Sequence, residues 1–203
     1  MKWLDWVQRL QAAAQDGLAF TENPFDRDRY GQIRELAAEI AAEHTGTPQP
    51  VIAELFEREK GYATPKLDCR AAVFRDDRIL LVQEIGDGLW TLPGGWVDVG
   101  ESPSEAVAKE VREEAGYEVR PTKLIAVHDR RLHNHPPFAW HLYKLFFLCE
   151  IIGEATKNEL ETDEVGFFAE EDLPPLSTGR TSPEQIAMCF RHYRNPELPT
   201  EFD

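Results

Sequence analysis

Three glutamates in the middle of the chain have the spacing of a cation site. Glu110, Glu113 and Glu114 lie in a strongly helical segment, residues 104–115, at helical positions i, i+3 and i+4. At about 100° per residue, the three carboxylates fall within an arc of roughly 100° on one face. They lie near the end of the helix, where the helix dipole disfavours negative charge and where neighbouring like charges repel each other. A solvent-facing acidic stripe is the alternative, but oxygen ligands for a hard divalent cation explain this placement, since the ion reverses the local penalty.

The segment before these glutamates favours the cation site over the acidic stripe. Gly94 and Gly95 follow Pro93 and permit tight backbone geometry, and Gly100 with Glu101 leads the loop into the helix. Such a loop leaves backbone carbonyl oxygens free to turn toward the same ions. The serines and the proline at 102–104 suit a helix start, and the glycine at 116 suits a left-handed helix end.

This stretch resembles the box of the Nudix hydrolases, G-x5-E-x7-R-E-U-x-E-E-x-G-U, in which U is a bulky apolar residue. The residues at the specified positions are, in order, Gly95, Glu101, Lys109, Glu110, Val111, Glu113, Glu114, Gly116 and Tyr117. All four acids of the box are present. Two positions depart from the pattern: Lys109 replaces arginine, keeping the charge but losing the bidentate fork, and Tyr117 replaces an aliphatic residue.

The resemblance extends over nearly the whole chain. The segments CRAAVFRDDRILLVQE and LWTLPGGW look like the family's lead-in to the box, and ETDEVGFFAEEDLPPL looks like its later strand and acidic turn. Residues 1–66 resemble the helical N-terminal module of a bacterial subgroup that hydrolyses compounds such as CDP-choline and ADP-ribose and looks dimeric through that module. The resemblance therefore implies a pyrophosphohydrolase that cleaves a nucleoside diphosphate linked to a group X, giving a nucleoside monophosphate and phosphorylated X.

The same resemblance implies the roles of the box residues. Glu110, Glu113 and Glu114 should bind Mg²⁺ or Mn²⁺, helped by a carbonyl of the pair Gly94–Gly95. Glu101 should order the loop and bond the substrate or a water on the metal. The cation would neutralise the pyrophosphate and acidify an attacking water.

A general base is expected outside the box. Glu161 and Glu164 lie just before a strand predicted at 165–168 and are the candidates. Solvated loop acids are the equally weighted alternative for both positions. If neither serves, Glu113 is the next candidate.

Substrate contacts are expected on the strand that leads into the domain and in one basic loop. Arg70 could contact a phosphate or pair with Glu84, and the pair is slightly favoured. The loop at 128–138 concentrates Arg130 and Arg131 in an otherwise acidic chain, so it could recognise the phosphate or the nucleoside. A flexible polar loop is the alternative.

Helices at both ends of the chain and strands between them must position these residues. Apolar periodicity predicts a first helix ending at Gly17, a second from near Asp26 to Thr45 and a third over 51–59. Strands are predicted at 67–75, 78–84, 117–128 and 141–151, and a last helix at 182–193. This order predicts an α/β sandwich. The resemblance implies that residues 67–203 form the Nudix α/β/α sandwich with a mixed sheet.

Residues 1–66 form a separate helical module in this interpretation. Three short helices cannot bury much by themselves. They should therefore pack on the rest of the chain or on a second subunit, and a homodimer is favoured.

Composition limits the partners and the compartment. The 37 acids against 22 bases give a net charge of −15, which disfavours binding to nucleic acid or an anionic membrane. We expect neither a signal peptide nor a membrane span, and three widely separated cysteines favour a reducing, cytoplasmic setting.

Two alternative functions remain: a house-cleaning nucleoside triphosphate pyrophosphatase, and a nucleotide-sensing regulator that binds without cutting. The complete box and the lack of a basic N-terminal module disfavour the regulator.

Overall fold

The computed structural model describes residues 1–158 and 162–203. The chain divides into two compact units. One, the helical unit, contains residues 1–65 together with 137–141, and the other, the sandwich unit, contains 66–136 and 142–203. Within the described residues, no helix has the length and apolar character needed to cross a membrane.

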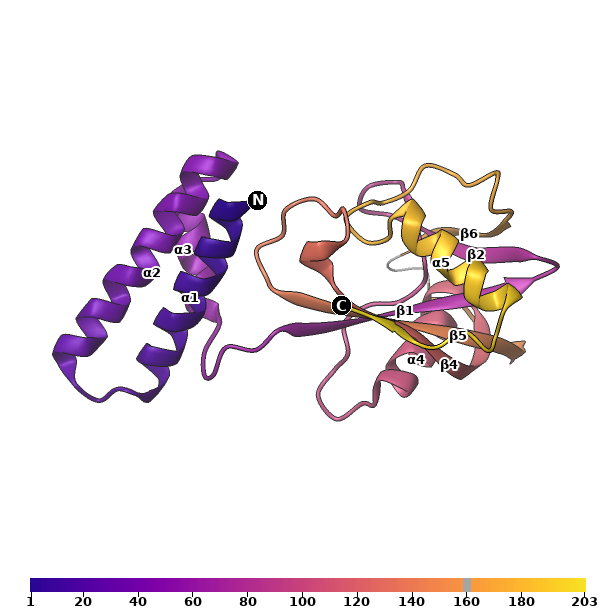
Figure 1. The fold of residues 1–203 in the computed structure, drawn as a ribbon, viewed down its shortest axis with the longest axis horizontal. Coiled ribbons are helices and arrows are strands. Elements are labelled where there is room, and N and C mark those ends of the chain that lie inside the picture. The colour runs from indigo at the N-terminus through magenta and orange to yellow at the C-terminus, as the bar shows by residue number, and fades with distance from the viewer. Residues whose placement is uncertain (159–161) are drawn as a thin grey trace. The chain divides into compact units, whose positions relative to one another are not determined.

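The helical unit is built from α1 (Lys2–Phe20), α2 (Pro24–Thr45) and α3 (Gln49–Arg58) (Figure 1). Gln8 Nε2 donates a hydrogen bond to the carbonyl oxygen of Phe138 at 3.1 Å, so the short segment 137–141 packs with the helices. The small core of this unit contains Val7, Ala37, Ala38, Ala41, Ile52 and Phe56.

The predicted end of the first helix at Gly17 was wrong. The helix α1 continues through Gly17 to Phe20, and Gly17 lies at a close contact between helices. A Cβ atom at Gly17 would lie 2.4 Å from ring atoms of Tyr30 on α2. The second helix also begins earlier than predicted, at Pro24, where the Asn23 side chain accepts a hydrogen bond from the backbone of Phe25 at 2.9 Å.

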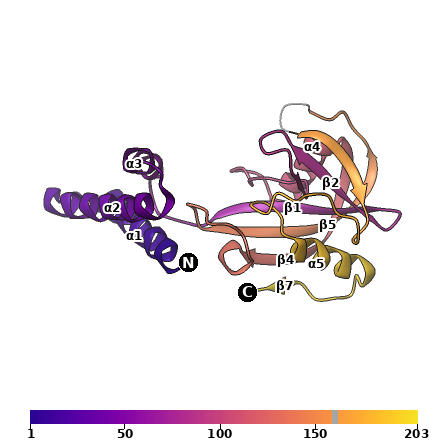
Figure 2. The same ribbon diagram turned by 90° about the horizontal axis from the view of Figure 1, so that it is seen from above.

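The sandwich unit is a mixed sheet with helices on both faces, which confirms the predicted fold (Figures 1 and 2). Among the described residues the strand order is β3-β2-β1-β5-β4-β7, and β6 also pairs with β2. β1 runs parallel to β5, whereas β1–β2 and β4–β5 are antiparallel. The elements are β1 (Lys66–Arg75), β2 (Arg78–Glu84), β3 (Trp90–Thr91), α4 (Pro103–Ala115), β4 (Tyr117–Asp129), a 3-10 turn (Arg130–Leu132), β5 (Leu142–Glu154), β6 (Thr162–Phe168), α5 (Pro183–Arg194) and β7 (Glu201–Phe202).

Two apolar clusters hold the helices to the sheet. Val107 and Val111 of α4 pack against one face, with Val73 and Val82 of the sheet. The other face carries a cluster in which Ile186, Met188, Cys189 and Phe190 of α5 meet Ile79, Leu81, Ile125 and Phe146. The helix that carries the box glutamates is therefore fixed by one face of the sheet, with α5 on the opposite face (Figure 2).

Candidate active site

Local signals in the sequence set the position of α4. Ser102 caps the helix: its hydroxyl accepts from the backbone N–H of Glu105 at 3.3 Å, and its own N–H donates to the Glu105 carboxylate at 2.9 Å. Gly116 ends the helix in the left-handed region, at φ 72°. Because Val111 and Ala115 are buried against the sheet, the helix carries Glu114 into a buried position at 6% exposure.

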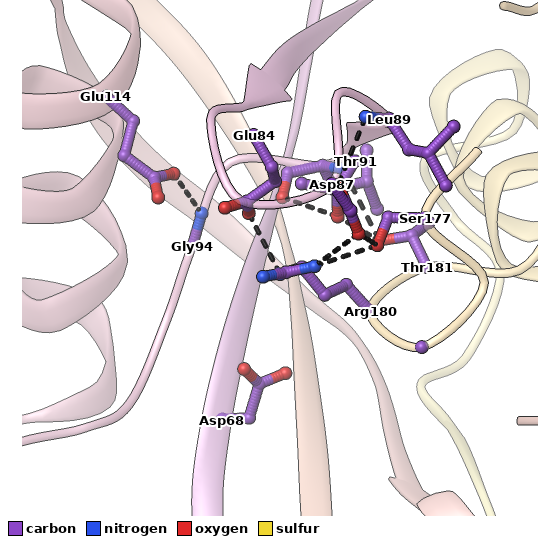
Figure 3. A network of polar contacts seen from close by, with 12 residues as sticks. Asp68, Glu84, Asp87, Leu89, Thr91, Gly94, Glu114, Ser177, Arg180 and Thr181 are labelled. Carbon is purple, nitrogen blue, oxygen red and sulfur yellow. Dashed lines mark hydrogen bonds and ion pairs between the residues drawn. The ribbon is translucent and has the colours of Figure 1, made fainter. Parts of the chain in front are cut away.

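The glycine pair before the helix meets two of these glutamates. The N–H of Gly94 donates to Glu114 Oε2 at 2.8 Å (Figure 3). Gly94 has φ +138°, and a Cβ atom there would lie 2.0 Å from the carbonyl oxygen of Cys69, so only glycine fits. At Gly95 a Cβ atom would approach the Glu110 carboxyl group to 3.2 Å. The loop therefore lies directly against both carboxylates.

Strand β1 holds this loop in place. The Cys69 N–H donates to the carbonyl of Gly95 at 2.9 Å, and the Ala71 N–H donates to the carbonyl of Pro93 at 2.9 Å. The carbonyl of Gly95 is thus turned toward β1. Between the two predicted carbonyl ligands, that of Gly94 is the better candidate.

The electrostatic environment of Glu114 is unusual for a carboxylate. Burial raises its pKa to about 8, opposed by Arg70 and by the Gly94 N–H, while repulsion from Glu110 and Glu84 raises it further. A cation placed here would remove this penalty, because it favours the ionised carboxylate. Among the charged groups that act on Glu114, the carboxylates Glu110 and Glu84 outnumber the single cation Arg70.

Lys109, which replaces the arginine of the Nudix box, holds the loop to the helix. Its ammonium lies 3.0 Å from each carboxylate oxygen of Glu101 and 3.1 Å from Asp98. These contacts raise the pKa of Lys109, chiefly through the hydrogen bonds to Glu101 and Asp98. Glu101, which is predicted to order the loop, is therefore also joined to the helix by an ion pair with Lys109.

Arg70 lies buried beneath the loop with a bidentate partner. Its guanidinium donates to both carboxylate oxygens of Asp68, at 2.7 and 3.1 Å, and to the carbonyl of Leu92 at 3.1 Å. Lys144, on the neighbouring strand β5, also forms an ion pair with Asp68. Asp68 therefore has an ion-paired environment in which Arg70 and Lys144 lower its pKa against the effect of burial.

The two arginines predicted in the basic loop are occupied within the protein. Arg130 is buried and donates to the carbonyls of Pro136 and Gly179, at 2.9 and 3.2 Å. Arg131 forms a bidentate pair with Asp129, the shortest contact being 2.6 Å. Arg130 is thus buried in the loop, whereas Arg131 keeps 37% of its side chain exposed while paired with Asp129.

Glu84 pairs with Arg180, a residue that was not predicted from the sequence. Arg180 Nε lies 3.1 Å from Glu84 Oε1, and Arg180 Nη1 lies 2.9 Å from Asp87 (Figure 3). Ser177 donates to the same Asp87 carboxylate at 2.8 Å. No periodic pattern in the sequence marks Arg180, because its partners lie more than ninety positions earlier in the chain.

Of the two candidate general bases, Glu164 and Glu161, the structure describes only Glu164. Glu164 is exposed on β6, next to Val165, which packs on the α4 side of the sheet. Side chains alternate along a strand, so Glu164 points away from that side. Glu161 lies outside the described residues. On either side of it, Asn158 N–H donates to the carbonyl of Glu113 at 2.7 Å, and the Thr162 hydroxyl donates to that of Glu114 at 2.8 Å.

The donor chemistry of this site fits a hard divalent cation. Within residues 1–158 and 162–203, no three aspartate, glutamate, histidine or cysteine side chains already converge as a complete cation site. However, carboxylate and carbonyl oxygens are the ligands that Mg²⁺ and Mn²⁺ prefer. Glu110 and Glu114 offer such oxygens beside a backbone that admits no side chain at Gly94.

Comparison with known proteins matches both parts of the chain. Residues 65–188 match the NUDIX domain, and residues 1–56 match the UDP-X-like N-terminal oligomerisation domain of Nudix proteins. YjhB of Bacillus subtilis, which carries the provisional name ADP-ribose pyrophosphatase, is 46% identical over 202 residues, covering 100% of this chain and 97% of that protein.

Two solved structures agree with this result. An ADP-ribose pyrophosphatase from Streptococcus suis is 48% identical with a TM-score of 0.63, covering 69% of this chain and 100% of that one. A UDP-X diphosphatase is 33% identical with a TM-score of 0.64, covering 100% of this chain and 98% of that one. With the box glutamates gathered beside their glycine loop, these matches show that the chain belongs to the Nudix hydrolase family.

Proposed function

We propose that this protein hydrolyses the phosphoanhydride of a nucleoside diphosphate linked to X, using Mg²⁺ or Mn²⁺. The observation that carries the proposal is the contact of Glu110 and Glu114 with the loop at Gly94 and Gly95. When bound, the cation would neutralise the diphosphate and make an attacking water more acidic. The products are a nucleoside monophosphate and phosphorylated X.

The chain's own residues then have distinct roles. We assign Glu110, Glu113 and Glu114 as cation ligands, with the carbonyl of Gly94 beside them. Glu101 keeps the loop against the helix through Lys109. Glu113 has 44% of its side chain accessible and is more exposed than the buried Glu114, so it can be reached from the solvent.

The identity of X is best sought among the compounds named for the relatives. ADP-ribose is the first choice, because two relatives near half identity carry ADP-ribose in their names. UDP-linked compounds come next, and CDP-choline remains from the sequence resemblance. Specificity in this fold depends on loops outside the box, so the fold alone does not select among them.

A substrate panel tests the proposal directly. ADP-ribose, UDP-sugars, CDP-choline and the four nucleoside triphosphates are incubated with the protein and Mg²⁺ or Mn²⁺, and the products are identified by mass. AMP with ribose 5-phosphate is the expected pair from ADP-ribose. Pyrophosphate released from triphosphates alone would support the house-cleaning alternative. Binding without cleavage of any compound would support the nucleotide-sensing regulator.

The raised pKa of Glu114 predicts a pH-dependent demand for the cation. A carboxyl with a pKa of about 8 is mostly protonated at pH 6, and it must lose that proton to bind a cation. The Mg²⁺ concentration for half-maximal activity should therefore fall as pH rises from 6 to 8, by up to about tenfold per unit, and level off above 8. Metal titrations of activity at pH 6, 7, 8 and 9 measure this. A constant Mg²⁺ requirement over that range would contradict the placement of Glu114 as a ligand.

We also propose that residues 1–66 are a dimerisation module and residues 67–203 the hydrolase domain. Large apolar side chains of the helical unit remain exposed, among them Trp6 at 54%, Leu36 at 48% and Val51 at 56%. The match to an oligomerisation domain supports the same role. A two-fold dimer is the commonest arrangement of identical chains.

The expected result is a dimer in solution. Light scattering coupled to size exclusion should give about twice the chain mass of 23.2 kDa. A shortened chain that starts at Thr64 should be monomeric, because it lacks the apolar helical surfaces. A monomeric full-length protein at micromolar concentration would refute the dimer, and a dimeric shortened chain would move the interface to the hydrolase domain.

The cysteines of the protein bear on its cellular compartment, and its net charge bears on its partners. Cys69, Cys149 and Cys189 are free and buried, and burial raises the pKa of Cys69 to about 11. We therefore propose a reducing, cytoplasmic location. With a net charge of −15, we propose small nucleotides rather than nucleic acid or membranes as partners.

A further inference from the structure

Substrates with a diphosphate need cationic contacts, and the arginines expected for this role are already bound. Arg70 is 6% exposed and donates to Asp68 and to a backbone carbonyl. Arg130 is also buried and donates to two carbonyls. Contact with substrate would require these buried side chains to leave partners that satisfy them, which is costly.

Arg180 is more exposed than Arg70 and Arg130. Arg131 is equally exposed, but its Nε and Nη2 donate to the single carboxylate of Asp129. The side chain of Arg180 is 37% exposed. The guanidinium is fixed on two sides: Nε pairs with Glu84 at 3.1 Å, and Nη1 donates to Asp87 and to the Ser177 hydroxyl, both at 2.9 Å. These contacts use Nε and Nη1 of the guanidinium. The fork is thus held in a fixed orientation while part of the side chain stays exposed.

The position of Arg180 connects it to the box glutamates. Glu84, its partner at the end of β2, contributes to the raised pKa of Glu114 by repulsion. In Figure 3 the guanidinium lies next to Glu84, with Gly94 and Glu114 on the far side of that carboxylate. Asp87 and Ser177 anchor the same guanidinium from the turn between β2 and β3 and from the turn before α5.

We propose that Arg180 is a substrate-binding residue whose guanidinium donates to an anionic oxygen of the diphosphate. The assignment rests on the proposed hydrolase function, since it places the diphosphate between the box glutamates and Arg180. Glu84 and Asp87 fix the planar fork before substrate arrives, which lowers the entropy lost on binding. They also cancel part of its charge, so the contact forms only when divalent cations neutralise the surrounding carboxylates.

The experiment measures binding of inorganic pyrophosphate by calorimetry with and without Mg²⁺. The wild type is compared with Arg180→Gln, Arg180→Lys and Arg120→Gln, the last a control that removes an exposed arginine paired with Glu150 at 2.6 Å. Arg180→Gln should weaken binding in Mg²⁺ at least about tenfold, as expected for loss of a charge-assisted hydrogen bond. Arg180→Lys should fall in between, because it keeps the charge and loses the fork. Arg120→Gln should stay within about twofold.

The variant Asp87→Asn distinguishes substrate binding by Arg180 from a purely structural role, in which Arg180 only connects the two turns. This change weakens the connection but leaves the guanidinium with less competing negative charge. The proposal expects a much smaller loss of pyrophosphate binding than in Arg180→Gln, because the lost pre-orientation and the reduced competing charge oppose each other. A purely structural role expects a loss as large as that of Arg180→Gln. Thermal melting of each variant checks folding. Equal loss in Asp87→Asn and Arg180→Gln, wild-type affinity in Arg180→Gln, or no pyrophosphate binding by the wild type would each overturn the proposal.

The outcome is distinguishable from failure of the hydrolase function. If pyrophosphate binding depends on Arg180 but no nucleoside diphosphate compound is cleaved, the function fails and the contact stands. If ADP-ribose is cleaved and Arg180→Gln keeps the wild-type KM, the contact fails and the function stands.

Discussion

Replacement of Glu114 or Glu110 by glutamine should lower kcat by at least about 10³-fold. Each carboxylate is proposed to hold the cation, and the cation is expected to provide several kcal/mol of transition-state stabilisation. Since about 1.4 kcal/mol corresponds to a factor of ten in rate, a loss of 10³-fold requires about 4 kcal/mol. Steady-state kinetics with saturating Mg²⁺ measure the effect, and excess EDTA should stop turnover in the wild type.

The structure allows this loss to be separated from unfolding. At neutral pH the Glu114 carboxyl, with a pKa of about 8, is largely neutral without a cation, so glutamine resembles it in charge and shape. The amide oxygen can still accept from the N–H of Gly94, as Oε2 does at 2.8 Å. Glu118→Gln, at an exposed site just beyond the helix, is the matched control and should retain full activity. Full activity of the wild type in excess EDTA would contradict the whole metal-dependent mechanism.

Local signals were sufficient to predict α4 and its loop. The Ser102 cap, the Gly116 end and the apolar stripe around Val111 all depend on neighbours within a few positions, and each is present in the structure. The glycine pair was also predictable, since the backbone at Gly94 excludes any side chain. These local features were enough to predict the candidate site, because the residues of the box form one continuous segment.

Contacts between distant segments were not predictable in the same way. Asp68 meets Lys144 only because β1 pairs in parallel with β5, with these two residues in register. Arg180 meets Glu84 and Asp87 across more than ninety positions. At Gly17, glycine was interpreted as a helix end, whereas the cause lies in Tyr30 on the next helix. In each case the deciding partner is set by the fold rather than by nearby sequence.

Lys109 illustrates how geometry can explain a departure from the family pattern. The usual arginine offers a flat fork for bidentate pairing, and lysine offers a compact charge. Here that charge lies among three acceptor oxygens, two on Glu101 and one on Asp98. A single ammonium can donate to all of them, so the loop stays joined to the helix without the fork.

The general base is the remaining catalytic group, and Glu161→Gln should slow turnover by about 10²–10⁴-fold with little change in substrate affinity. Glu161 lies outside the described residues, so its candidacy rests on its place in the sequence just before β6. Glu164 is exposed on β6 and adjoins Val165, which packs on the α4 side. Strand alternation therefore directs Glu164 away from that side, and Glu164→Gln should have a much smaller effect.

Kinetics of both variants across pH 6–9, with Glu154→Gln as a control, separate loss of a base from loss of binding. A missing base lowers kcat and kcat/KM together and removes the acidic limb of the rate profile, whereas a lost contact raises KM alone. Glu154 is exposed at the end of β5, so its variant should match the wild type. If Glu161→Gln and Glu164→Gln both keep more than about half of the activity, neither is the base. Glu113→Gln then becomes the decisive variant, since Glu113 is the remaining candidate for deprotonating water.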